Sequence, residues 1–313
     1  MPRFDVTVAG ELNLDLILYG LPEQLAPERE LLASQMMLTL GASSGIFVYN
    51  LSVLGSRVGF QSRIGDDQLG AMAFERLQEG GVDVSCLRRV SGSTQTGLTV
   101  ILQHEGWRNI LTYSGTIAEL NWDDLDLDYL SDSRHFHLSS FYLQTGLRPR
   151  IPELFRRMKA AGLTTSLDTN DDPEDKWQSD LLDTLAYVDV FLPNAREAKK
   201  IAGTDDLDEA VRHLSRRVPL LVVKLGQQGA MGVRGAEKLV VPALKVDAVD
   251  PVGAGDSFDA GFLHQYVRGA ELSACLHGGN LAGALSTTRP GGTEAYRDRA
   301  HREGFFRKHA STA

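Results

Sequence analysis

The chain has 313 residues, and its hydrophobic content of 42% with 23% charged residues is enough to build a large core. A formal net charge of −9 argues against nucleic acid as a partner, because that binding needs clustered Lys and Arg. Cys86 and Cys275 are the two cysteines and lie far apart, which argues against a disulfide framework or a thiolate zinc site. The N-terminus lacks the apolar core of a signal peptide, and no apolar run approaches the ~20 residues of a membrane span. We therefore expect a soluble, cytoplasmic protein without membrane contact.

Short apolar runs alternate with helix-length patterns along most of the chain. The runs predict strands at 4–10, 58–65, 134–140, 163–170, 188–194 and 219–226. Stretches 68–81 and 151–162 have helical spacing and lie between strands. This alternation predicts an α/β fold in three layers, with a mostly parallel central sheet and helices on both faces. In such sheets ligands bind beyond the carboxyl ends of the strands.

Segments 12–40 and 93–118 break the alternation, because they contain strand-like pieces without helices between them. We expect these segments to form a small β-lid over the site, within a single domain that spans residues 1–313.

The stretch DPVGAGDSFDAGF, residues 250–262, places two glycines in a turn directly before a helical pattern. The backbone N–H groups of Gly253, Ala254 and Gly255 are then expected at a helix N-terminus, where a phosphoryl group fits. Asp256 in the first turn has two interpretations. It is either a carboxylate that takes part in chemistry or a partner of the helix dipole.

This stretch resembles the C-terminal signature of the PfkB (ribokinase-like) family of carbohydrate and nucleoside kinases. Further stretches support the resemblance: GELNLDLI from Gly10, LSVLGSRVGFQSRIGDDQLG from Leu51, PNAREAKKIAG from Pro193 and VVKLGQQGA from Val222. The resemblance implies a ribokinase-like fold and ATP-dependent phosphorylation of a hydroxyl on a small sugar. A nucleoside kinase of the adenosine type and a sugar-acid (2-keto-3-deoxygluconate) kinase are the alternatives.

The resemblance also implies roles for the turn and its helix. Gly253, Ala254 and Gly255 would offer N–H groups to the γ-phosphoryl group of ATP, and Asp256 would accept the proton of the attacking hydroxyl. Phosphoryl transfer relies on positioning and electrostatic stabilisation, so a backbone cradle and one base suffice.

Other family elements imply the cofactor sites. Glu197 and Asn194 would organise Mg²⁺ through water, although their spacing also fits a capping box, and both can hold together. Four residues would border the nucleotide: Lys224, Gly226, Gly229 and Asn280. A solvent-exposed strand end is the other interpretation of Lys224. A monovalent cation such as K⁺ would lie at Asp250 and Val252.

Acceptor residues are expected near the start of the chain. Asn13 and Asp15 alternate with leucines, so both point to one face of a strand, where they would bind sugar hydroxyls beside Gly41. The lid segments would also pair two subunits into a homodimer, as in some relatives, if the outer face of the lid is apolar.

The stretch GASSGI, residues 41–46, departs from the family's G-G-x-x-x-N motif. Ala42 replaces the second glycine and Ile46 replaces the asparagine, so an amide that contacts the sugar is lost. Ser43 or Ser44 would take over its polar contacts. GASSG also matches the G-x-S-x-G nucleophile elbow, which makes a serine hydrolase the rival hypothesis. A catalytically silent sensor on the same fold is the third.

DTNDDPEDKW, residues 168–177, resembles the D-x-N-x-R…W stretch of relatives that phosphorylate 2-keto-3-deoxygluconate. Asp172 stands where those relatives carry an arginine for the substrate carboxylate, and three further acids lie nearby: Asp171, Glu174 and Asp175. Four carboxylates near the acceptor predict a neutral substrate, a pentose or ketohexose, over a sugar acid. Arg108 in the lid is a candidate to approach such an acid instead.

His135 and His137 share one face of a predicted strand. They could chelate a metal, but no third ligand is visible, and a pair near the substrate or simple packing is the alternative.

Overall fold

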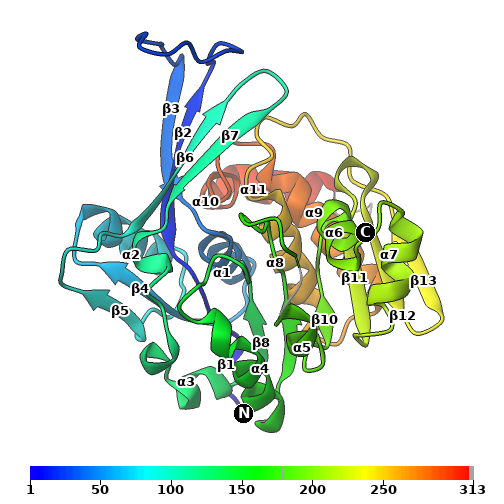
Figure 1. Cartoon of the computed structure of the whole chain (residues 1–313). Helices are drawn as coiled ribbons and strands as arrows, with labels where there is room; N and C mark the ends of the chain where they lie inside the picture. Colours follow the sequence, from blue (N-terminus) through cyan, green and yellow to red (C-terminus); the bar gives the residue numbers. More distant parts are fainter. Residues whose placement is uncertain (178–179, 310–313) are drawn as a thin grey trace.

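The computed structural model describes residues 1–177 and 180–309, and two sheets organise them (Figure 1). The larger sheet has nine strands in the order β13-β12-β11-β10-β9-β8-β1-β4-β5. Its strands are β1 (Phe4–Ala9), β4 (Val58–Gly65), β5 (Leu87–Val90), β8 (Ser133–Leu138), β9 (Thr164–Leu167), β10 (Val190–Phe191), β11 (Leu220–Lys224), β12 (Ala230–Arg234) and β13 (Glu237–Val241). Every pair from β5 to β11 is parallel, and β12 and β13 add an antiparallel edge. The predicted mostly parallel sheet is confirmed.

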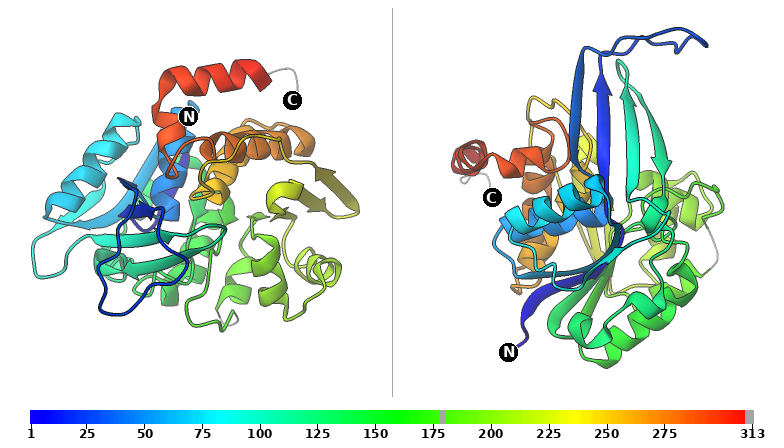
Figure 2. Two further views of the ribbon diagram at one scale, coloured as in Figure 1. Left: turned by 90° about the horizontal axis from the view of Figure 1, so that it is seen from above. Right: turned by 90° about the vertical axis from the view of Figure 1, so that its left-hand side faces the viewer.

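Helices cover both faces of this sheet (Figures 1 and 2). One face packs against α1 (Ser43–Val53), α2 (Gln68–Glu79), α8 (Ala254–Tyr266), α9 (Leu272–Ser286), α10 (Glu294–Arg297) and α11 (Arg299–His309). The other packs against α3 (Leu127–Ser131), α4 (Ile151–Ala160), α5 (Leu181–Leu185), α6 (Ala195–Ala202) and α7 (Leu207–Leu214). In β11, Leu220 and Val222 belong to the first core and Leu221 and Val223 to the second, because strand side chains alternate between faces. The three-layer prediction is confirmed.

The smaller sheet has four strands in the order β3-β2-β6-β7 and projects from the body at the top of Figure 1. Its strands are β2 (Asn13–Tyr19), β3 (Gln35–Leu40), β6 (Gly97–Gln103) and β7 (Arg108–Tyr113). They come from the two segments without helices, 12–40 and 93–118. We call this sheet the lid.

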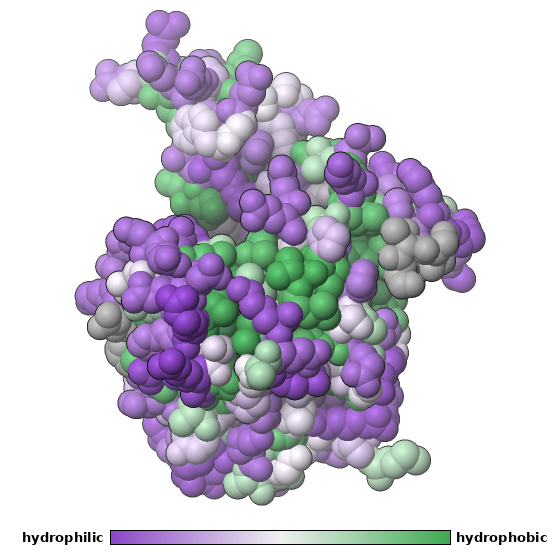
Figure 3. All heavy atoms as spheres, turned by 90° about the vertical axis from the view of Figure 1, so that its right-hand side faces the viewer, coloured by the Kyte–Doolittle hydropathy of each residue, from purple (hydrophilic) through white to green (hydrophobic). Residues whose placement is uncertain are grey.

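The surface is less polar where the lid meets the body. Figure 3 shows polar side chains over most of one side of the molecule, with apolar side chains gathered in the middle, below the projecting lid. On the inner side of the lid, Ile17 and Ile101 pack against Val252 in the turn before α8. The lid therefore rests on the turn that the sequence identified as a phosphoryl cradle.

Several elements differ from the sequence expectation. The hairpin β12–β13 and the edge strand β5 were not predicted, and β10 is two residues long inside the predicted run 188–194. Four 3₁₀ turns connect other elements: Gly115–Ile117, Trp122–Asp124, Arg148–Arg150 and Gly226–Gln228. Within the described ranges, no helix combines the length and apolar character needed to span a membrane.

Helix α1 begins at a strained residue. Ala42 has φ 58° and ψ 142°, a backbone conformation that is nearly restricted to glycine. Ala42 is also the residue that replaces the second glycine of the family motif. The chain therefore keeps the glycine conformation without the glycine.

Replacing Ala42 with glycine should relieve this strain. We expect Ala42→Gly to raise the free energy of unfolding by about 1 kcal/mol, measured by urea denaturation. The control is Ala161→Gly, where φ is −77° and alanine is unstrained, so the same change should not stabilise. Equal effects of the two variants would contradict the strain assignment.

Candidate active site

Polar side chains follow the carboxyl ends of three adjacent strands. Asp168 follows β9, Asn194 follows β10, and Lys224 ends β11. A β-bridge joins Asn194 to Lys224. The N-terminus of α8 faces the same edge, because a Cβ placed on Gly255 would lie 3.6 Å from Lys224 Nζ. Three strand ends and one helix N-terminus thus enclose a single site, as expected for a parallel sheet.

The turn before α8 has the shape of an anion cradle. Gly253 caps the helix with φ 71°, and a Cβ there would lie 2.6 Å from Gly292 Cα, so this position requires glycine. Gly255 is helical rather than left-handed, and only atoms of Lys224 come within 4 Å of its side-chain position. The N–H of Ala254 donates to Pro251 O at 3.2 Å. This leaves Gly253 and Gly255 as the cradle donors that are not engaged within the described residues.

Asp256 lies in the first turn of α8 and is partly exposed. Burial raises the pKa of its carboxyl to about 6; Asp168 raises it further, while Lys224 and a hydrogen bond from Ser43 oppose the rise. Such a carboxylate is mostly ionised at pH 7, yet it is more basic than an ordinary aspartate. Its position suits a general base, and it interacts favourably with the helix dipole at the same time.

The Lys224 side chain is only 11% exposed, so the interpretation as a solvent-exposed strand end is wrong. Its Nζ donates to Asp168 Oδ2 at 2.7 Å and to Asp259 Oδ2 at 3.1 Å. Burial acts to lower the pKa of Lys224, but Asp168, Asp259 and Glu197 raise it overall, so the ammonium stays charged. Asp168 and Asp259 were not predicted as site residues from the sequence. The available signal for Asp259 was its place three residues after Asp256, on the same side of α8.

Asn194 and Glu197 form the capping box that their spacing allows. Asn194 N donates to Glu197 Oε2 at 2.8 Å, and Glu197 N donates to Asn194 Oδ1 at 3.0 Å. Burial raises the pKa of Glu197 to about 7, Asp168 adds to the rise, and Lys224 opposes it. The carboxylate keeps lone pairs beyond the capping bonds, and oxygen ligands suit hydrated Mg²⁺. The residues therefore fit a water-mediated magnesium site.

The acceptor residues converge as the strand alternation predicts. A Cβ on Gly41 would lie 2.1 Å from Asp15 Oδ1 and 2.5 Å from Asn13 Oδ1, so both side chains meet at this glycine. Asn13 Nδ2 donates to Thr99 Oγ1 at 2.8 Å, while its Oδ1 is buried without a donor in the described part of the chain. Burial raises the pKa of Asp15 to about 7; Asp256 and Asp250 add to the rise and Arg108 opposes it. A ligand hydroxyl, such as that of a sugar, can supply the donor that Asn13 Oδ1 lacks among the described residues.

Asp250 connects the cradle to the lid. Its Oδ2 accepts from Tyr19 Oη at 2.6 Å and from Gly291 N at 3.0 Å, and its Oδ1 accepts from Val252 N at 3.0 Å. Tyr19 is the last residue of β2. The hydrogen bond from Tyr19 and the packing of Val252 therefore hold the lid against the turn before α8.

Of the other residues expected around the nucleotide, one has open space beside it and two contact the chain segment after β13. Gly226 has φ 60° and open space where a side chain would lie. A Cβ on Gly229 would lie 2.0 Å from Val241 O, so this glycine accommodates the chain after β13. Asn280 Nδ2 donates to the carbonyls of Val241 and Pro242 at 3.0 and 3.1 Å, which fixes the same segment against α9. Gly226 alone of these three has open space beside it, although its carbonyl accepts from Gly229 N at 3.0 Å.

The GASSGI stretch does not form a hydrolase nucleophile elbow. Ser43 begins α1 after β3, a lid strand paired antiparallel with β2, whereas an elbow follows a strand of the central sheet. The Asn170 amide donates to Ser43 Oγ, and no described histidine contacts it. Ser44 is bound to the buried Glu11 carboxylate at 2.7 Å, and Ile46 packs against Gly253 and Gly292. Ile46 therefore supports the cradle rather than the acceptor.

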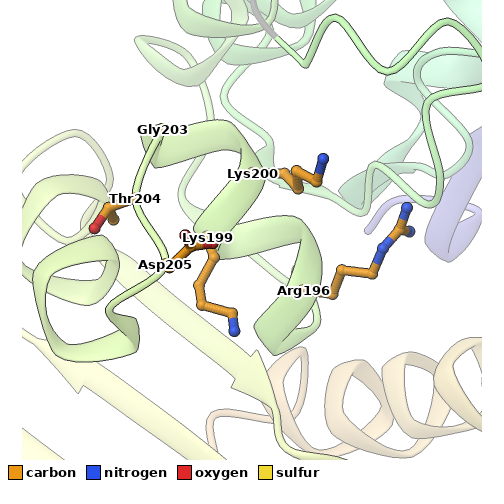
Figure 4. A pocket seen from close by; sticks show the side chains of 6 residues that line it. All are labelled: Arg196, Lys199, Lys200, Gly203, Thr204 and Asp205. Atoms are coloured by element: carbon orange, nitrogen blue, oxygen red, sulfur yellow. The ribbon is translucent and has the colours of Figure 1, made fainter.

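The four acids of residues 171–175 do not form a repulsive acceptor wall. Asp172 accepts three backbone N–H bonds, from residues 174, 176 and 177. The other three pair with cations: Asp171 with Arg196, Glu174 with Lys176 and Asp175 with Lys200. Arg196 and Lys200 line a surface pocket of about 340 Å³ at the end of α6 (Figure 4). The predicted acid wall is therefore wrong, because Asp172 is satisfied within its own loop, Glu174 pairs with the nearby Lys176, and Asp171 and Asp175 pair with α6.

His135 and His137 pack and hydrogen-bond rather than bind a metal. A chain of hydrogen bonds of 2.7–2.8 Å runs from Thr164 through His135, Ser166 and His137 to Ser139. Burial lowers the pKa of His135 to about 3 and that of His137 well below its ordinary value, so both rings are neutral. Within the described residues, no group of three or more candidate ligands could hold a metal ion.

The fold and the site together define a kinase of the ribokinase-like class. Residues 4–299 match the model of the pfkB family of carbohydrate kinases, and the chain belongs to that family. It is an ATP-dependent carbohydrate kinase. Family membership overturns the serine hydrolase, and Asp256, whose loss would mark a silent sensor, is present.

Relatives of the chain act on chemically different acceptors. It is 29% identical to 2-dehydro-3-deoxygluconokinase of Bacillus subtilis, over 80% of this chain and 81% of that one. It is 28% identical to the ATP-dependent ribose-1-phosphate kinase of Halopiger xanaduensis, over 93% and 94%. The crystal structure of adenosine kinase from Sinorhizobium meliloti superposes with a TM-score of 0.83 at 26% identity, covering 96% and 99% of the two chains. Family membership thus leaves the acceptor open.

The Tyr19–Asp250 hydrogen bond gives a prediction for the lid. We expect Tyr19→Phe to raise the acceptor KM several-fold with little change in the ATP KM, because the lid loses one of its attachments to the cradle turn. Steady-state kinetics with each substrate varied in turn measures this. Tyr113→Phe is the control, since Tyr113 is exposed in β7. An unchanged acceptor KM would show that the bond does not hold the lid.

Proposed function

We propose that this kinase transfers the γ-phosphoryl group of ATP to a hydroxyl of a small neutral sugar, a pentose or ketohexose. The observation that supports this acceptor is the meeting of Asn13 Oδ1 and the Asp15 carboxylate at Gly41, where Asn13 Oδ1 is buried without a donor among the described residues. Neutral hydroxyls can donate to both groups. An anionic group at the same place would face Asp15 and Asp256, whose carboxylates already disfavour each other's ionised form.

Each residue of the site has a part in this transfer. Asn13 and Asp15 bind the sugar and orient its hydroxyl, and Asp256 removes the hydroxyl proton as the new bond to phosphorus forms. The N–H groups of Gly253 and Gly255 stabilise the charge on the γ-phosphoryl group, and Ala254 maintains the turn between them. Closure of the lid through Tyr19 excludes water that would compete with the sugar.

The cofactor proposals rest on the chemistry of the residues. Glu197 and Asn194 would hold Mg²⁺ through water, and the ion would neutralise charge on the phosphates. Lys224, Gly226, Gly229 and Asn280 would border the nucleotide, the last two through the chain segment that they position. K⁺ at Asp250 and Val252 is the least supported proposal, because Asp250 already accepts three hydrogen bonds.

Two other acceptor classes compete with a neutral sugar. A nucleoside presents neutral ribose hydroxyls and satisfies the same acceptor atoms. A sugar acid would need a cation, and Arg108 of β7 lies on the Asp15 side of the lid, where it stabilises the Asp15 carboxylate. ADP release measured side by side for ribose, fructose, adenosine and 2-keto-3-deoxygluconate tests the proposal. The highest kcat/KM should belong to a neutral sugar, and a preference for the sugar acid would contradict it.

The base assignment predicts a loss of turnover and a pH dependence. We expect Asp256→Asn to lower kcat by about 10²–10⁴ with the fold intact. In the unaltered enzyme kcat/KM should fall about tenfold per pH unit below pH about 6, because protonation of Asp256 removes the base. Asp208→Asn is the control, since Asp208 also lies in the first turn of a helix, α7, where it pairs with the exposed Lys238. Near-normal turnover in Asp256→Asn would end the assignment.

The acceptor assignment predicts a separation of the two Michaelis constants. Asp15→Ala should raise the sugar KM at least tenfold and leave the ATP KM nearly unchanged, because Asp15 meets the acceptor alone. Asp15→Asn keeps one acceptor oxygen, so its sugar KM should lie between those of the unaltered enzyme and of Asp15→Ala. Weakened ATP binding with an unchanged sugar KM would show that Asp15 serves the nucleotide.

We also propose that two copies of the chain pair through the lid. Cross-strand partners place one set of side chains on the lid face opposite Asp15: Leu16, Leu18, Met36, Val100, Leu102, Leu111 and Tyr113. Met36, Leu111 and Tyr113 are more than half exposed. An apolar face of this extent marks an interaction surface, and a second lid presents the same face.

Sedimentation measurements at micromolar concentration test this pairing. We expect a dimer for the unaltered chain and a monomer for Leu111→Glu, because a charge in the apolar face cannot be buried. Lys159→Glu on α4 is the control, since it lies outside the lid. A monomeric unaltered chain would contradict the proposal.

A further inference from the structure

The buried cluster beneath the cradle contains two acids that phosphoryl transfer itself does not require. Asp168 and Asp259 are 0% and 1% exposed, and both bind Lys224 Nζ. Asp168 follows β9 in the sheet and Asp259 lies inside α8, so they approach the ammonium from two adjacent layers. The side-chain position of Gly255 lies 3.6 Å from the same nitrogen. The cluster therefore lies directly against the proposed phosphoryl cradle.

The Lys224 ammonium has one N–H donor without a hydrogen-bond acceptor among the described residues. An ammonium has three N–H donors, and two of them meet Asp168 and Asp259. No third acceptor for this nitrogen is found among residues 1–177 and 180–309. We infer that Asp168 and Asp259 are positioning residues that hold Lys224 beneath the cradle, with its third N–H directed to a γ-phosphoryl oxygen of ATP. This inference rests on the proposed phosphoryl transfer over Gly253 and Gly255.

A lysine needs such positioning more than an arginine does. Its four-carbon chain is flexible and its ammonium is a point charge, so a contact with phosphate has a defined geometry only if other bonds fix the nitrogen. Two acceptors from two layers fix it better than one. Loss of either acceptor frees Lys224 to move away from the cradle.

The carboxyl groups of Asp168 and Asp259 can also share a hydrogen bond with each other. Asp168 Oδ1 and Asp259 Oδ1 are both buried, and neither has a donor within the described residues. A proton shared between the acids fills this gap, and burial raises the pKa of Asp259 well above its ordinary value. An asparagine at position 259 reproduces a protonated aspartate, because its amide can donate to Asp168 while its oxygen accepts from Lys224.

The charges around Asp256 give a second readout that a purely structural role would not affect. Asp168, Asp259, Lys224 and Asp15 are the charged or titratable groups that face Asp256. Lys224→Met removes the cation and should move the acid limb of kcat/KM to higher pH. Asp168→Asn removes a negative charge and should move it to lower pH.

The experiment compares nucleotide binding without turnover. Titration calorimetry measures the Kd of AMP-PNP and of ADP, each with Mg²⁺, for the unaltered chain and for Lys224→Met, Asp259→Leu and Asp259→Asn. The AMP-PNP Kd should rise at least tenfold in Lys224→Met and several-fold in Asp259→Leu, while the ADP Kd changes less than threefold. Asp259→Asn should restore most of the AMP-PNP affinity. Lys159→Met is the matched control, because Lys159 pairs with Asp189 at 2.8 Å just before β10, at the end of the sheet opposite the cradle.

The outcomes separate this inference from the proposed function. Equal losses of AMP-PNP and ADP binding, or none, would overturn the contact between Lys224 and the γ-phosphoryl group while leaving the kinase proposal intact. An AMP-PNP loss in Asp259→Asn as large as in Asp259→Leu would overturn the positioning role. Failure of the unaltered chain to bind either nucleotide would overturn the proposed function instead. Thermal unfolding of each variant identifies any variant that fails to fold. In that case Asp168→Asn replaces it, and steady-state kinetics should show a lower kcat with an unchanged sugar KM.

Discussion

The site depends on the burial of one positive charge. Placing the Lys224 ammonium in the interior is costly unless acids surround it, and Asp168 and Asp259 bind it from the sheet and from α8. These bonds fix the N-terminus of α8 against the ends of β9 and β11. The cradle, Asp256 and the acceptor residues are all positioned relative to that helix, so their geometry follows from the same charge cluster.

Local motifs made part of the site predictable from the sequence. The turn at Gly253, the place of Asp256 at a helix start and the pairing of Asn194 with Glu197 all arise within a few residues, and the structure shows each of them. The alternation of strands and helices gave the layers for the same reason. Backbone detail was less accessible, because Gly253 rather than Gly255 has the left-handed conformation and Ala254 donates its N–H within the turn.

The contacts that could not be predicted from the sequence join residues that are far apart along the chain. Lys224 meets partners 56 and 35 residues away, and the acids of 171–175 are paired mainly with α6. Neither contact has a local pattern. The proposal of a neutral acceptor therefore rests on Asn13 Oδ1, which lacks a donor among the described residues, and on Asp15 beside it, and not on the acids of 171–175. The bond between Tyr19 and Asp250 joins positions 231 residues apart, and it makes the lid part of the same site.

The central claim is that phosphoryl transfer takes place at the N-terminus of α8. A crystal structure with AMP-PNP, Mg²⁺ and the best neutral sugar tests it most directly. The account predicts γ-phosphoryl oxygens within hydrogen-bond distance of the N–H groups of Gly253 and Gly255, and an acceptor hydroxyl within about 3 Å of Asp256. A γ-phosphoryl group bound away from this turn, or a sugar with no hydroxyl near Asp256, would contradict it.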